Sequence, residues 1–302
     1  MRRRSILALL TLILAVILPL TAAAEDPPAP TTRHSIRVDG LPVAGPAEVV
    51  AFIIESPPGA QTPPYTRPGL LVATTLAGEV TLTTDGVEKA YKVGEVSTEP
   101  PGVVTVARNR GAVRAFQMGS MVIPRGAAPG TTVPGASPPA APALVSHSLH
   151  RTAAILPAGP YEVAQTLQDF APGAQTPPHT HPGQVVVTVL AGELSFTTGG
   201  ATKTYKVGES FVELPGVVGQ ARNAGTAPAT VKAVYLLPKG APLSNPVAPT
   251  APATGSGGNR PAMPNTGAGG GNDRPLVAWL VLAVGGALAA GGRLLRQRVH
   301  RA

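Results

Sequence analysis

The feature that most constrains the fold of this 302-residue chain is an internal duplication. The two copies align at one constant offset without a gap, and about half of the aligned positions are identical. The matched pairs include Gly45 and Gly159, Gly59 and Gly173, Gly78 and Gly192, Gly94 and Gly208, Asn109 and Asn223, and Gly126 and Gly240. We therefore expect two domains of one fold, over residues 37–125 and 151–239.

Each copy consists of short apolar and β-branched runs that Pro and Gly interrupt. Examples are residues 49–54, 70–76 and 80–82. Runs of this length with closely spaced turns predict an all-β domain. Asp85-Gly86 and its counterpart Gly199-Gly200 predict two-residue hairpin turns. Two tandem immunoglobulin-like sandwiches are the alternative that shares this strand pattern.

The N-terminal residues predict export. Residues 1–24 combine an arginine cluster, an apolar run and three alanines, as a signal peptide does. Residues 25–36 form a Pro-rich lead. The chain has no cysteine, which excludes disulfides and thiolate chemistry. Arginines at the two extreme ends account for most of the formal net charge of +8, so we expect no nucleic-acid partner.

The segments between and after the copies are poor in large apolar residues. Residues 126–150 predict a linker and residues 240–275 a flexible stalk. Residues 276–292 predict a marginal transmembrane helix that anchors the protein in the membrane, and residues 293–302 a cytoplasmic basic tail. The stalk contains a pentapeptide that resembles the sorting signal of sortase-anchored surface proteins, which implies cell-wall attachment: Met263, Pro264, Asn265, Thr266 and Gly267.

The second copy contains the strongest candidate site, a Pro-Pro pair followed by His179-Thr180-His181. Residues two apart on a strand point to the same face, so both imidazoles can bind one divalent metal ion. Gln184, a water molecule, or the pair His147 and His150 could complete the set. The alternative is a pair of polar residues at a barrel mouth that bind no metal.

The first copy has Tyr65 and Arg67 in place of the two histidines. A guanidinium beside a phenol can bind a carboxylate or a sugar hydroxyl. The alternative is a surface pair without a ligand.

The spacing of these residues resembles the two motifs of the cupins, which are small jelly-roll β-barrels. Gly173, His179, His181 and Gly192 fit the first motif, and Gly208, Gly216 and Asn223 fit the second. Gly94, Pro100, Gly102 and Asn109 fit the second motif in the first copy. The resemblance implies two tandem cupin domains and makes a dimer plausible. Cupin enzymes of this type use three His and one Glu, but the Glu position holds Val185 and the third His position holds Gly219.

We therefore expect an extracytoplasmic, surface-anchored protein whose second barrel binds a small molecule or, weakly, a metal. One alternative is a metal-dependent oxygenase or isomerase with two barrels that uses His179 and His181. The other is a structural surface spacer.

Overall fold

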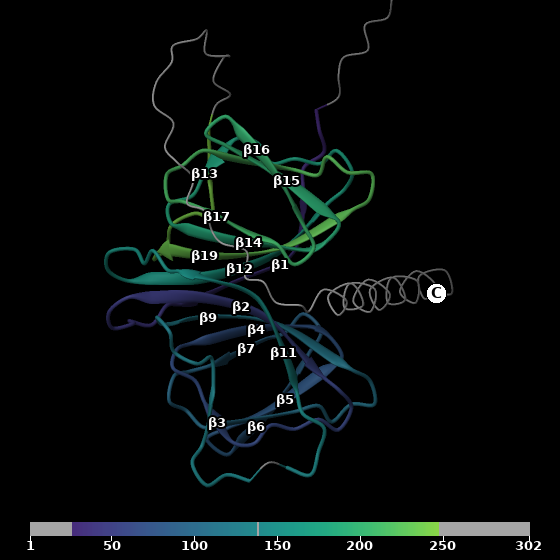
Figure 1. The fold of residues 1–302 in the computed structure, drawn as a ribbon, viewed down its shortest axis with the longest axis vertical. Coiled ribbons are helices and arrows are strands. Elements are labelled where there is room, and N and C mark those ends of the chain that lie inside the picture. The colour runs from purple at the N-terminus through teal and green to yellow at the C-terminus, as the bar shows by residue number, and fades with distance from the viewer. Residues whose placement is uncertain (1–25, 138, 248–302) are drawn as a thin grey trace, which may run out of the picture.

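The computed structural model describes residues 26–137 and 139–247, which form two β-barrels that pack against each other (Figure 1). Each barrel consists of an inner five-stranded sheet, which faces the other barrel, and an outer five-stranded sheet. All pairings within the sheets are antiparallel. The described residues therefore confirm the all-β prediction and the jelly-roll barrels. No helix among them has the length and apolarity to cross a membrane.

Barrel 1 is formed mostly by the first copy. Its inner sheet has the order β11 (Val145–Ala153), β2 (Ala47–Ser56), β9 (Ala115–Pro124), β4 (Leu71–Ala77), β7 (Val96–Glu99). Its outer sheet has the order β10 (Thr131–Thr132), β3 (Tyr65–Thr66), β8 (Thr105–Arg108), β5 (Glu79–Thr84), β6 (Val87–Lys92).

Barrel 2 repeats this arrangement with the second copy. Its inner sheet has the order β1 (Thr31–Asp39), β12 (Tyr161–Phe170), β19 (Ala229–Pro238), β14 (Gln184–Ala191), β17 (Ser210–Glu213). Its outer sheet has the order β16 (Ala201–Lys206), β15 (Glu193–Thr198), β18 (Gly219–Arg222), β13 (His179–Thr180), β20 (Asn245–Pro246).

The two predicted hairpin turns are confirmed. Asp85 and Gly86 join β5 to β6 with φ angles of 48° and 78°, and Gly199 and Gly200 join β15 to β16 with 56° and 76°. Positive φ at both central positions is the geometry of a type I′ turn, whose twist matches that of the strands it connects.

The first strand of each copy belongs to the barrel of the other copy. β1 precedes barrel 1 in the chain but pairs with β12 of barrel 2, and β11 precedes barrel 2 but pairs with β2 of barrel 1. Repeat-related ion pairs support both exchanges, because Arg37 contacts Glu162 at 2.8 Å and Arg151 contacts Glu48 at 2.5 Å. The two barrels therefore exchange strands and are not simply joined in tandem.

The two inner sheets pack face to face and bury a shared interface. Its apolar part includes Val49 and Val122 of barrel 1 against Val163 and Leu236 of barrel 2. Its polar part includes Gln165, which accepts a hydrogen bond from the Ser120 hydroxyl and donates one to the Val72 carbonyl. Lys232 is fully buried and donates its Nζ hydrogen to the Gly119 carbonyl of the opposite sheet.

The structure differs from the predicted segment boundaries at three places. The lead over residues 25–36 and the linker over residues 126–150 contain β-strand, since β1 begins at Thr31 and β11 at Val145. The predicted stalk begins inside barrel 2, because Asn245 and Pro246 pair with β13. Segments before, between and after the copies thus complete the sheets. The predicted signal peptide, the pentapeptide at residues 263–267, the transmembrane helix and the basic tail lie outside the described residues.

Candidate metal centre

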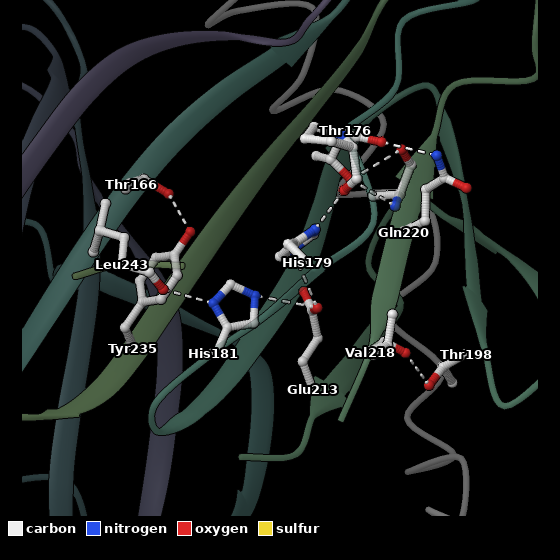
Figure 2. Close-up of polar contacts among 12 residues, drawn as sticks. Thr166, Thr176, His179, His181, Thr198, Glu213, Val218, Gln220, Tyr235 and Leu243 are labelled. Carbon is white, nitrogen blue, oxygen red and sulfur yellow. Dashed lines mark hydrogen bonds and ion pairs between the residues drawn. The ribbon is translucent and has the colours of Figure 1, made fainter. Parts of the chain in front are cut away.

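Of the two histidines predicted as metal ligands, His179 lies on β13 and His181 follows that strand directly, and their side chains lie close together in barrel 2 (Figure 2). Their rings are buried, with 8% of His179 and 4% of His181 exposed. The ring centroids are 4.7 Å apart, and the ring planes are nearly perpendicular. The sequence therefore predicted correctly that the two imidazoles share one space.

Backbone carbonyls orient both imidazoles. The Nδ1 atom of His179 lies 2.9 Å from the Pro177 oxygen, and that of His181 lies 2.6 Å from the Leu243 oxygen. A carbonyl can only accept, so each Nδ1 carries the hydrogen and each Nε2 is left with a lone pair for another partner. Hydrogen bonds of this kind fix the tautomer and the ring orientation of metal-binding histidines.

Glu213 at the end of β17 supplies a carboxylate between the two rings (Figure 2). Its Oε2 atom is 3.3 Å from His181 Nε2 and 3.7 Å from His179 Nε2. One ligand atom from each of the three side chains lies within 4.8 Å of the others. Two imidazoles and one carboxylate form the 2-His-1-carboxylate set that binds divalent transition metals with open positions.

The buried polar atoms of this cluster fit a metal ion. His181 Nε2 and Glu213 Oε2 are fully buried, and neither makes a hydrogen bond to the described residues. An unpaired buried acceptor or donor costs free energy, because it has lost its water without gaining a partner. A cation between the three side chains would satisfy both atoms.

Glu213 stands across the sheet from the position that the cupin motif assigns to a Glu. Val185 occupies that position on β14 and pairs directly with Glu213 on β17. Directly paired residues of an antiparallel ladder point to the same face. The neighbouring strand thus delivers the carboxylate to the space that a side chain at residue 185 would reach.

Sequence reasoning missed Glu213, although a signal for it was present. Glu99 occupies the same position in the first copy, so this carboxylate is retained in both copies. Glu99 also pairs directly with Leu71, which is the counterpart of Val185.

The three candidates for a further ligand lie elsewhere. The Gln184 side chain is 2% exposed, and it bonds Ile155 N at 2.7 Å and the Ala153 carbonyl at 3.0 Å. His147 and His150 lie on β11, in the inner sheet of barrel 1. The predicted contribution of these residues to the barrel 2 site is therefore wrong, since the strand exchange carries both histidines away.

The electrostatics of the centre follow from its burial and from the polar groups around it. Burial acts to lower the pKa of His181, but the Glu213 carboxylate and the Leu243 carbonyl outweigh it, and the net pKa is raised. Tyr235 stacks edge-on to His181 at 5.6 Å, and burial raises its pKa to about 12. Its hydroxyl group contacts Thr166 and stays neutral at ordinary pH.

The centre opens into a cavity of about 200 Å³ inside barrel 2. The cavity wall includes the three side chains of the centre and a set of apolar residues: Phe170, Val187, Leu194, Phe211, Val231 and Ala233. Gly219 pairs with His179 at the position where the motif expects a third His. A Cβ atom there would lie 2.5 Å from the Phe196 ring and 3.1 Å from Glu213 Oε2, so Phe196 already occupies the space that a side chain at residue 219 would need.

The equivalent place in barrel 1 is closed by the chain itself. Glu99 Oε2 accepts hydrogen bonds from the Tyr65 hydroxyl and from Arg67 Nε, both at 2.7 Å. The Arg67 guanidinium also donates to the Pro129 carbonyl and lies over the Tyr65 ring. Tyr65 and Arg67 do bind a carboxylate, as their chemistry predicts, but that carboxylate is Glu99 rather than a ligand from outside.

Comparisons with known proteins agree with this fold. A cupin domain model matches residues 166–235. A germin-like protein of Arabidopsis thaliana, subfamily 2 member 2, is 47% identical over 73 residues, which are 22% of this chain and 33% of that protein. The chain thus spans about a third of the length of the curated relatives it matches.

The likeness to solved structures extends over about two thirds of this chain at low sequence identity. The vicilin of Solanum melongena is 12% identical with a TM-score of 0.51, over 66% of this chain and 76% of that chain. An oxalate decarboxylase variant from Bacillus subtilis is 12% identical with a TM-score of 0.48, over 68% and 77%.

Proposed function

Because this chain belongs to the cupin superfamily, we propose that its second barrel binds one divalent transition-metal ion through His179, His181 and Glu213. Nitrogen and oxygen donors in this ratio favour ions of the Mn²⁺ and Fe²⁺ type over ions that prefer thiolates. The bound ion presents its open positions to the apolar cavity, where a small molecule can reach it. We therefore infer a metal-dependent small-molecule-binding protein.

The observation that carries this proposal is the contrast between Glu99 and Glu213. The two carboxylates occupy the same position in the two copies, and Glu99 is satisfied by a phenol and a guanidinium. Glu213 faces two imidazoles and keeps its buried Oε2 atom unpaired. In barrel 1 the Arg67 guanidinium is the cation beside Glu99, whereas in barrel 2 the cation beside Glu213 has to be bound. We therefore expect one metal ion per chain.

Metal content of the purified full-length chain, measured by elemental mass spectrometry, tests the proposal. We expect one equivalent in the wild type and none in a His179→Ala/His181→Ala variant. Glu213→Gln should weaken affinity by more than the roughly 10–100-fold that loss of a supporting partner costs. Glu99→Gln is the matched control and should keep one equivalent. Metal retained by the double alanine variant would place the site elsewhere.

A variant of barrel 1 tests whether two histidines and one glutamate are sufficient to bind a metal ion. Tyr65→His/Arg67→His would give Glu99 the same two neighbours that Glu213 has. We expect a second metal equivalent in this variant, because the carboxylate is already in place. A count that stays at one would show that the carbonyls behind His179 and His181 are also required.

Catalysis at the metal is a second candidate function, as in an oxygenase or isomerase with two barrels. Three protein ligands with open positions are typical of catalytic metal sites, whereas structural sites are closed. Oxygen consumption by the metal-loaded chain in the presence of a bound small molecule would favour the oxygenase. Binding without turnover would favour the binding protein.

We also propose that the protein is exported and anchored at the cell surface. The support is the sequence alone: the apolar run and alanines of residues 1–24, the apolar run of residues 276–292, and the arginines that follow it. Protease treatment of intact cells should then release the barrels. Barrels that stay protected until lysis would contradict this localisation.

A further inference from the structure

We propose that the ligand of barrel 2 is a small monocarboxylate with an apolar body, whose carboxylate completes the coordination of the metal. This inference rests on the proposed metal site and specifies what that site takes. It is carried by three properties of the cavity: its charge, its lining and its size.

The charge of the site selects a monoanion. A divalent ion bound to Glu213 and two neutral imidazoles leaves one net positive charge. Of the described residues that line the cavity, Glu213 is the sole Asp, Glu, Lys or Arg. A neutral ligand would leave that charge uncompensated in an apolar environment, and a dianion would reverse it, and both cost free energy. A monoanion makes the filled site neutral.

Barrel 1 shows the same charge balance within the chain. The monocation Arg67 meets the monoanion Glu99, and both groups are largely buried, with 12% and 4% of their side chains exposed. The fold thus holds one positive and one negative charge together at this place. In barrel 2 the metal ion and Glu213 together carry one net positive charge, so the balancing anion has to come from a ligand.

The lining and the size select an apolar body. Beyond the metal ligands the wall consists mainly of aromatic and aliphatic side chains, with neutral polar groups at Gln168, Thr176 and Ser244. The volume of about 200 Å³ is below the roughly 300–1,000 Å³ of pockets for drug-sized ligands. One ring or one branched carbon chain therefore fits this space.

The test uses the full-length chain loaded with Co²⁺, whose visible absorption spectrum changes when its ligands change. Metal content is measured first. Benzoate is the probe, acetate lacks the apolar body, benzyl alcohol lacks the charge, and phthalate carries two charges. We expect benzoate to half-saturate the spectral change at a concentration roughly 10-fold or more below each of the other three, since burial of the ring adds to the charge effect.

A pair of matched variants locates the binding in the cavity. Ala221 lines the cavity of barrel 2, and Ala107 is its counterpart in barrel 1. The two alanines have matching backbone environments. The Ala221 amide donates to the Thr176 hydroxyl and the Ala107 amide donates to the Thr62 hydroxyl, both at 3.0 Å. Ala221→Leu should weaken the affinity for benzoate by about 10-fold or more, because the larger side chain narrows the apolar space. It should leave the affinity for acetate and the metal content unchanged. Ala107→Leu should change neither.

Different failures have different meanings. A chain that binds Co²⁺ but responds equally to benzoate and acetate, or equally to benzoate and benzyl alcohol, would overturn the inference and leave the metal site standing. Tighter binding of phthalate would overturn the charge argument. A chain that binds no Co²⁺ would overturn the proposed function and the inference with it. If Ala221→Leu does not fold, the four probes on the wild type still decide.

Discussion

Lys232 places an amine between the two barrels, where its repeat counterpart Met118 places an apolar side chain. Among the described residues, its Nζ atom has one hydrogen-bond partner, the Gly119 carbonyl. Burial lowers its pKa well below the ordinary value of a lysine, and no charged group in the described part of the chain opposes this shift. Burial also lowers the pKa of His34 and of His150, which lie on the exchanged strands. The assembled barrels therefore favour neutral bases at these positions.

Replacing Lys232 by the residue of the other copy should stabilise the protein. A lysine with a lowered folded pKa binds its proton more readily when unfolded, so stability falls as pH decreases from the unfolded pKa of 10.5 toward the folded value. Lys232→Met should raise the free energy of unfolding near neutral pH by about 1–3 kcal/mol, since it removes a poorly satisfied buried group. It should also flatten the pH dependence in this range.

Chemical denaturation at a series of pH values between neutral and alkaline measures both effects. Lys206→Met is the control, because Lys206 is exposed on β16. A Lys232→Met protein that is less stable than the wild type at neutral pH would show that the Gly119 hydrogen bond outweighs the cost of burying the amine.

The ligands of the candidate site could be predicted only in part. His179 and His181 follow from strand periodicity, because residues two apart share a face. Glu213 comes from another strand, and its place beside the imidazoles depends on the pairing of β17 with β14. The motif assigns the carboxylate to residue 185, where the chain has Val. A motif read along one strand does not show that the strand beside it can deliver the same group.

At the scale of strands, the duplication predicted the content of each barrel but not the exchange of β1 and β11. The repeat is clear from Gly45 to Gly126 and from Gly159 to Gly240, and both exchanged strands lie before these ranges. Tertiary contacts decide which inner sheet β1 or β11 joins, because the edge of either sheet can pair with an antiparallel strand. The ion pairs of Arg37 with Glu162 and of Arg151 with Glu48 link residues far apart in the chain, so no local pattern indicates them.

The end of barrel 2 illustrates the same limit. Residues 240–247 have the composition of a stalk, yet Leu243 orients His181 and Asn245 pairs with Thr180. The corresponding segment of barrel 1 does the same, since Pro129 accepts a hydrogen bond from Arg67 and Thr131 pairs with Thr66. These short segments contribute backbone carbonyls and amides to the sites, and composition does not indicate such contributions.

At the scale of the whole molecule, exchange and face-to-face packing make the two barrels one unit. Each barrel contains a nine-residue strand from the chain segment that precedes the other barrel. The inner sheets also bury apolar side chains and the Gln165 network between them. Separation of the barrels would expose this apolar surface and unpair both exchanged strands, which costs far more than separation of two domains that share only a linker.

Cleavage of the connection between the barrels tests this unity. A specific protease site inserted after Gly135, at an exposed turn that follows β10, should be cut without separation of the two fragments. The fragment that ends at this site carries β1, which remains paired with β12 in barrel 2, and the other fragment carries β11, which remains paired with β2 in barrel 1. Size-exclusion chromatography should therefore show one peak with the size of the intact chain, and denaturant should be needed to resolve two. Metal content should also stay at one equivalent after cleavage, because every proposed ligand lies on one side of the cut. Two peaks under native conditions would contradict the exchange, since barrels joined only by residues 126–144 would diffuse apart once that segment is cut.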